Sequence, residues 1–278
     1  MLYLKEGFVH FWSSIKKNRG LVVGIIILQV IFLALVGMVG ITYQVKVITD
    51  MNTIMDQLDT ANYNPEELQK GEPFLENMFI IQRSYQSLQQ NIIEGLSWMG
   101  ALFIVFHGGL WLLSHHVVKR IPIKYLGKMF LKFLLVSIIL LGSFFALAYF
   151  LLKDLITAAA DVNFVATVTK YLVAAFVVVY YILTVFLTLL DEPRWKDFFR
   201  SWWKTAIKKI HKTISIIIIN ATFMLGSFYL IYTYLSPDNV ILILFFFLVL
   251  TLMLSVSRIV VITTIQAILL KKRHVEDN

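Results

Sequence analysis

Six apolar runs, each about as long as a membrane is thick, divide this chain of 278 residues. A helix needs about 20 apolar residues to cross a hydrocarbon core of about 30 Å, and every run reaches or approaches that length. The strands of a membrane β-barrel alternate in polarity, whereas runs such as 242–247 do not. We therefore predict an all-α, polytopic integral membrane protein with six transmembrane helices. The predicted spans are residues 21–43, 95–118, 130–152, 168–190, 213–235 and 240–264.

The composition supports lipid as the main solvent of this chain. It is 59% hydrophobic with a mean hydropathy of +0.77, against about 45–50% apolar residues in a soluble domain. The net charge of +8 would suggest nucleic acid as the partner of a soluble protein. Beside membrane spans, the same charge indicates contact with anionic lipids of the inner leaflet, so no nucleic-acid partner is expected. No cysteine occurs, which excludes disulfides, thiolate catalysis and cysteine-based metal centres, and we expect no cofactor.

Positive charge gathers in every second gap between the apolar runs. Lys and Arg near span ends stay on the cytoplasmic side, which predicts that both termini are cytoplasmic. The remaining gaps, an outer loop at 153–167 and an outer turn at 236–239, contain few basic residues. Most of the basic residues lie in the segments 1–20, 119–129, 191–212 and 265–278, as Lys5, Lys16, Lys17, Arg19, Lys119, Arg120, Lys124, Lys128, Arg194, Lys196, Arg200, Lys204, Lys208, Lys209, Lys212, Lys271, Lys272 and Arg273.

Two of the basic segments have the pattern of amphipathic helices that lie in the membrane interface. In 1–20 and in 191–212, aromatic and aliphatic residues recur every three or four positions, and lysines fill the opposite face. The basic linker 119–129 keeps this spacing more weakly, because Pro122 interrupts it. The order of an amphipathic segment followed by two spans thus occurs three times. This repetition is explained either by an internal duplication or by the common features of interfacial helices.

The segment 44–94 is the one sizeable extramembrane piece, and it is acidic. It contains eight acidic residues against three basic ones. Helical spacing on both sides of a turn-forming stretch at 62–73 predicts an extracytoplasmic helical hairpin. The hairpin either packs on neighbouring loops or docks another protein. The candidate docking residues are Asp56, Asp59, Glu66, Glu67, Glu72 and Glu76.

Polar residues within the spans are the candidates for a path across the membrane. His107, Asn220 and Gln29 lie in apolar runs, where interhelical hydrogen bonds explain them as well as a functional path does. No acidic residue lies centrally in a span, which argues against a carrier coupled to ions through a buried carboxylate. Residues at span ends are candidate contacts for lipid headgroups. These are His115, His116, Lys119, Arg120, Arg258, Lys204 and Lys208.

The sequence contains no catalytic motif, no phosphate-binding loop and no pattern of metal ligands. We therefore expect a non-enzymatic subunit or scaffold of a membrane complex, with a protein partner or a second copy of the chain docked through the acidic hairpin or the spans. The alternative is a transporter or lipid-handling protein, and a third possibility is an enzyme acting on lipid near His115, His116 and Arg258. The expected location is the cell membrane of a prokaryote.

Overall fold

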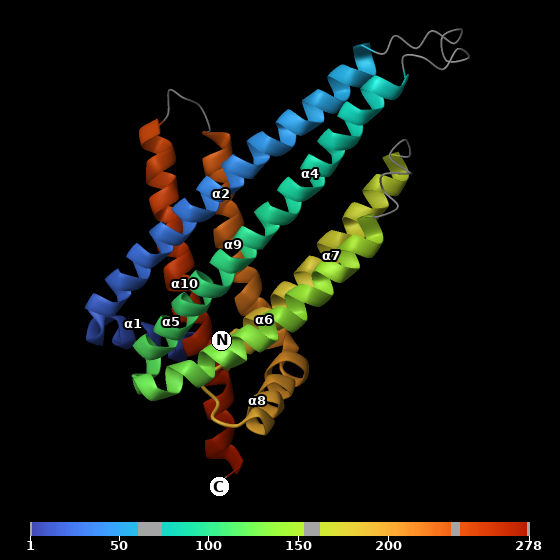
Figure 1. Cartoon of the computed structure of the whole chain (residues 1–278). Helices are drawn as coiled ribbons and strands as arrows, with labels where there is room; N and C mark the ends of the chain where they lie inside the picture. The colour runs from blue at the N-terminus through green and yellow to red at the C-terminus, as the bar shows by residue number, and fades with distance from the viewer. Residues whose placement is uncertain (1, 61–73, 153–161, 235–239, 277–278) are drawn as a thin grey trace. The chain divides into compact units, whose positions relative to one another are not determined.

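The computed structural model describes residues 2–60, 74–152, 162–234 and 240–276, and within these ranges the chain is helical, without strands. Six helical segments are long and apolar enough to cross a membrane, which confirms the prediction of a multi-pass membrane protein. The elements, labelled in Figure 1, are α1 Leu2–Lys17, α2 Arg19–Thr60, α4 Phe74–Leu102, η1 Phe103–His107, α5 Gly108–Lys119, α6 Ile123–Leu152, α7 Val162–Leu187, α8 Trp195–Trp202, η2 Trp203–Lys208, α9 Ile210–Thr233 and α10 Val240–Glu276.

The chain forms two compact units. Unit 1 consists of residues 1–29 and 108–278, and unit 2 consists of residues 30–107. The predicted turn at 62–73 and the outer turn 236–239 lie wholly outside the described residues, as does most of the outer loop 153–167.

Helix α10 lies at the centre of unit 1, in contact with α1, α5 and α9. It is the most buried of the six candidate spans. The buried residues of α10 recur at helical spacing and include both aliphatic and polar side chains. Leu250, Ile259, Ile262 and Ile265 are buried there, together with Thr251, Ser255, Arg258, Thr263 and Thr264.

Helix α1 packs on α10 through a glycine. A Cβ atom at Gly7 would lie 2.5 Å from Thr264 Oγ1 and 2.9 Å from Thr264 Cα, so only glycine allows the two helices to come this close. Phe11 is buried on the same helix, whereas Phe8 and Trp12 are exposed. Asn18 follows α1 and donates a hydrogen bond of 2.8 Å to the carbonyl oxygen of Val117. The aromatic residues predicted to form one face of 1–20 are therefore divided: one is buried in unit 1 and the other two are exposed.

The predicted amphipathic segment 191–212 is divided into α8 and a π-helical turn, η2. Trp202 stacks on Phe186 of α7, with ring centroids 4.8 Å apart and an interplanar angle of 4°, and Phe198 is fully buried beside them. A π-helical turn alters the regular hydrogen bonding of the backbone. Two side chains bond to carbonyl oxygens in η2: Tyr181 donates to Ala206 O at 2.7 Å, and Thr213 donates to Thr205 O at 3.0 Å.

Unit 2 is built from part of α2, with α4 and η1. Asn91 Nδ2 donates a hydrogen bond of 2.8 Å to Asp50 Oδ2, and Tyr43 donates one of 3.3 Å to Glu94 Oε2. A Cβ atom at Gly95 would lie 3.0 Å from the ring of Tyr43. The two helices are thus held together by close packing and by polar contacts between side chains.

Candidate functional site

A polar cluster lies in unit 1 where α5 and α7 end. His115 is fully buried and donates its Nε2 hydrogen to the carbonyl oxygen of Leu187 at 2.8 Å. Leu187 is the last residue of α7, and carbonyl groups in the last turn of a helix have no partner within the helix. The bond therefore supplies one of these carbonyls with a donor. His115 Nδ1 lies 3.7 Å from Asp191 Oδ1, and Asp191 also forms an ion pair with Lys119.

The sharp reversal between α5 and α6 shapes the next part of the site. Arg120 has a φ of 50°, in the left-handed region that a residue just after a helix often adopts. Its backbone N–H donates a hydrogen bond of 2.8 Å to His116 O, and the His116 Nδ1–H bonds to Ile121 O at 2.8 Å. Because Pro122 lacks an N–H group, it suits the position just before α6. Lys119 and the first turns of α6 are thereby placed around one cavity.

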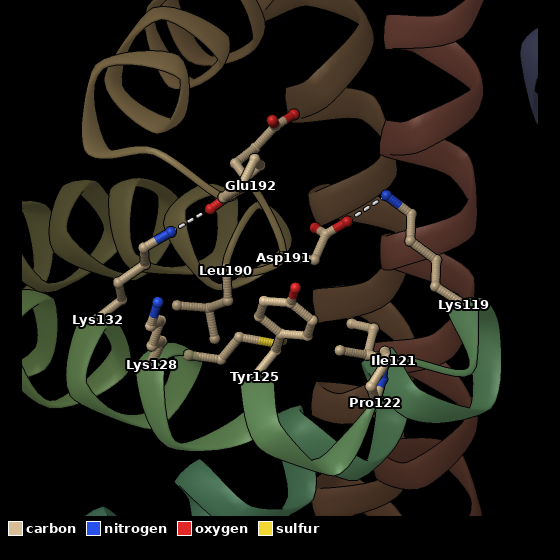
Figure 2. Close-up of a pocket in the computed structure, with 11 residues that line it drawn as sticks. Lys119, Ile121, Pro122, Tyr125, Lys128, Lys132, Leu190, Asp191 and Glu192 are labelled. Atoms are coloured by element: carbon tan, nitrogen blue, oxygen red, sulfur yellow. Dashed lines mark hydrogen bonds and ion pairs between the residues drawn. The ribbon is translucent and has the colours of Figure 1, made fainter.

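This cavity has a volume of about 470 Å³. Lys119 and the reversal at 121–122 form one side, the first turns of α6 contribute Tyr125, Lys128, Met129 and Lys132, and residues 190–193 after α7 complete it. Figure 2 shows these groups converging from the three segments. The lining combines three lysines and two acidic residues with apolar side chains.

The lysines of the cavity differ in their partners. Lys119 pairs with Asp191. Lys132 is only 5% exposed, and its Nζ donates to the backbone carbonyl of Glu192. It also lies 5.7 Å from the centroid of the Trp195 ring. The carboxylate of Glu192 extends away from Lys132 (Figure 2) and accepts a hydrogen bond of 3.4 Å from the Ser201 hydroxyl.

A second polar site lies within the candidate spans. Arg258 Nη2 donates a hydrogen bond of 2.7 Å to Gln29 Oε1, and both residues are at most 5% exposed. In the part of the chain that the structure describes, no carboxylate lies within 4 Å of Arg258, and its Nε has no hydrogen-bond partner. The sequence predicts that Arg258 contacts headgroups, whereas in this structure its side chain is buried beside Gln29. The guanidinium points into the bundle because Arg258 shares the buried face of α10 with Thr251 and Ser255.

The other predicted path residues are not gathered with this pair. His107 closes the π-helical turn η1 in unit 2, where its ring stacks on Phe103 at 4.5 Å. Asn220 is half-buried on α9 in unit 1.

The predicted headgroup residues are divided between buried and accessible positions. His115 lies inside unit 1, where the helix-end carbonyl of Leu187 holds it, and its side chain is not available to a lipid headgroup. His116 and Lys204 are half-buried, whereas Lys119, Arg120 and Lys208 are exposed.

The candidate docking residues lie largely beyond what the structure describes. Asp56 is exposed on α2. Asp59 and Glu76 belong to α2 and α4, but their side chains are outside the described part, as are Glu66, Glu67 and Glu72 altogether.

Comparison with protein families, with curated proteins and with solved structures finds no match. Within the described ranges, no group of three or more His, Asp or Glu side chains could hold a metal ion.

Sequence reasoning missed the residues that build the cavity. In the sequence, Lys128 only marks orientation, and no pattern assigns a role to Asp191, Glu192 or Lys132. The sequence does show an acidic pair directly after one apolar run and basic residues directly after another, but it does not indicate that the two segments lie together.

Proposed function

We propose that this chain is a non-enzymatic subunit or scaffold of a membrane complex, which docks a partner protein through an arm. The arm consists of residues 44–60 of α2 and the part of α4 that pairs with them. In this proposal both termini are cytoplasmic and the arm projects from the opposite side of the cell membrane. The distribution of Lys and Arg supports this orientation.

An apolar stripe on α2 is the observation that carries the proposal. Helix α2 has 42 residues, so at 1.5 Å per residue it is about 63 Å long, roughly twice the hydrocarbon thickness. Beyond the apolar run that ends at residue 43, apolar side chains continue at intervals of three and four residues. They are Val45, Ile48, Met51 and Met55, each between 46% and 58% exposed. An apolar stripe outside the membrane is typical of a protein interface.

Charge indicates the chemistry of the partner. The segment 44–94 has five more acidic than basic residues, and Asp56 lies exposed close to the stripe. A second copy of the arm would bring like charges together, which opposes association. The partner that fits is a helix or surface with apolar side chains flanked by lysine or arginine.

Two matched substitutions test the docking arm. Ile48→Lys places a charge on the stripe, and Thr49→Lys adds the same charge to an exposed position about 100° further around the helix. A photoreactive residue at Val45 identifies what touches the stripe in native membranes. We expect one crosslinked partner that Ile48→Lys removes and Thr49→Lys retains. Crosslinks to lipid alone, or equal loss in both variants, would refute the docking role.

Orientation is tested separately with single cysteines, because the chain has none of its own. A cysteine at Thr49 should react with an impermeant maleimide added outside intact cells. A cysteine at Lys208, which is exposed, should react only after the cells are opened. The reverse pattern would overturn the proposed orientation. It would not decide whether the stripe docks a partner, which the crosslinking variants test.

The alternative function is lipid handling, and the lysine-lined cavity of unit 1 is the observation that favours it. A cavity of about 470 Å³ falls within the usual range of sites for small ligands. Transfer of labelled lipid between vesicles by the purified chain would favour this alternative over a scaffold.

A further inference from the structure

The cavity bounded by Lys119, α6 and residues 190–193 has cations without matching carboxylates. Among the described residues, the carboxylate within 4 Å of a lysine of this cavity is that of Asp191, which pairs with Lys119. Glu192 accepts a hydrogen bond from Lys132 through its backbone carbonyl, while its carboxylate is not within ion-pair distance of Lys132. No described side chain forms an ion pair with Lys128 or Lys132. Two ammonium groups at one cavity therefore have no carboxylate in direct contact, although Asp191 and Glu192 act on Lys132 from a longer distance.

The placement of these two lysines suits a single anion. Lys128 and Lys132 are four residues apart on α6, and residues at this spacing lie on the same face of a helix. Tyr125, three residues before Lys128, lines the same cavity and adds a hydroxyl group. Figure 2 shows both lysines at one side of the cavity, with Tyr125 beside Leu190 in the middle of the view. A tetrahedral anion could accept hydrogen bonds from both ammonium groups at once.

Lys132 gains most from such an anion because it is nearly buried. The rings of Trp195 and Phe198 lie 5.7 and 5.5 Å from its Nζ and stabilise the charge in part. A cation–π contact is weaker than a charge-assisted hydrogen bond to an oxyanion. The cavity is thus prepared for a negatively charged oxygen group.

The remaining lining selects among anions. Ile121, Met129 and Leu190 are apolar, so the ligand must carry apolar groups beside its charge. The cavity also lies where the candidate span Met78–Lys119 ends and the candidate span Ile123–Leu151 begins. If these helices cross the membrane, the ends of the spans are where lipid headgroups lie. Basic pockets between membrane helices are known recognition sites for anionic headgroups.

We propose that this cavity binds the phosphate group of an anionic phospholipid, held by Lys128 and Lys132. The apolar lining would contact the glycerol and the first carbons of the acyl chains. This inference is independent of the docking arm, since no residue of 44–94 contributes to the cavity.

The test measures lipid bound to the full chain by native mass spectrometry after purification in detergent. Short-chain phosphatidylglycerol, short-chain phosphatidylcholine and inorganic phosphate are titrated in turn. Lys128→Gln removes one ammonium group at an exposed position, so the fold is preserved. Lys124→Gln is the matched control, because it makes the same charge change one turn away without lining the cavity. Lys132→Gln follows as a second variant.

We expect one phosphatidylglycerol per chain, with phosphatidylcholine bound clearly more weakly. Lys128→Gln should weaken the binding of phosphatidylglycerol about tenfold, since it removes a charge-assisted hydrogen bond to the phosphate. Lys124→Gln should change the affinity for phosphatidylglycerol by no more than about twofold, as expected for a screened surface charge. Equal weakening by both variants, or no preference between the two lipids, would overturn the site. Binding of inorganic phosphate alone, with the same dependence on Lys128, would retain the phosphate site but overturn its lipid source.

Discussion

The hydrogen bond between Gln29 and Arg258 allows a quantitative test of how unit 1 is held together. Arg258 Nη2 lies 2.7 Å from Gln29 Oε1, and both side chains are buried. Gln29→Leu keeps a similar volume but leaves the guanidinium without its acceptor. Breaking a buried charged pair on one side costs about 3–5 kcal/mol in soluble proteins. We expect the lower end here, about 3 kcal/mol, because the acceptor that is lost is neutral.

The reciprocal change should cost less. Arg258→Met removes the buried charge and leaves only the amide of Gln29 unsatisfied, which costs about 1–3 kcal/mol. It also removes the Nε atom that has no partner among the described residues, and this offsets part of the loss. In the double variant neither polar group remains, so its cost should be smaller than the sum of the two. Coupling between polar side chains in membranes averages about 0.6 kcal/mol and reaches about 1.7. We expect about 1.5 kcal/mol, because the donor is charged.

The assay is reversible unfolding in mixed micelles with increasing dodecyl sulfate, followed by far-ultraviolet circular dichroism. The four chains of the cycle give the free energy of unfolding at a common reference composition. If the two single costs add to within about 0.5 kcal/mol, the residues behave as independent sites. That result would refute the reasoning, because a bond between two buried groups requires coupling.

Two further substitutions test the packing of α1 and of η2. Gly7→Ala should lower the free energy of unfolding by about 1–3 kcal/mol, since the new Cβ would meet the backbone of Thr264. Gly24→Ala is the control: a Cβ atom there meets nothing within 4 Å, so this variant should be neutral or slightly stabilising. Equal stability of the two variants in the same assay would contradict the close contact. Tyr181→Phe removes the donor to Ala206 O and should cost about 1 kcal/mol. Amide hydrogen exchange should accelerate in 203–208 while α10 keeps its protection, and uniform acceleration would show that the bond does not act locally.

The number of candidate spans could be predicted because it depends on length and polarity along the chain. A run of about 20 apolar residues needs no tertiary information to be identified as a span. The direction in which a side chain points around a helix is different, because it depends on the neighbours that the helix acquires. Arg258 illustrates this point: its position along α10 suggested a headgroup contact, but its position around α10 places it beside Gln29.

The cavity and the π-helical turns could not be predicted for related reasons. Asp191 and Lys119 are 72 residues apart, and no local pattern indicates that they pair. A π-helical turn inserts a residue without changing the composition, so Phe103–His107 reads as an ordinary helix in the sequence. The cavity, by contrast, is built from elements that are distant in the chain.

The central position of α10 has a consequence for synthesis in the cell. Gln29 is separated from Arg258 by 229 positions, and Gly7 of the first helix packs against Thr264 of the last. While a ribosome is still making the earlier spans, Gln29 faces lipid without its partner and α1 lacks the surface on which it packs. Unit 1 therefore closes only after α10 has been made. A nascent chain that stalls before α10 should remain open and become a substrate for the proteases that remove unassembled membrane proteins.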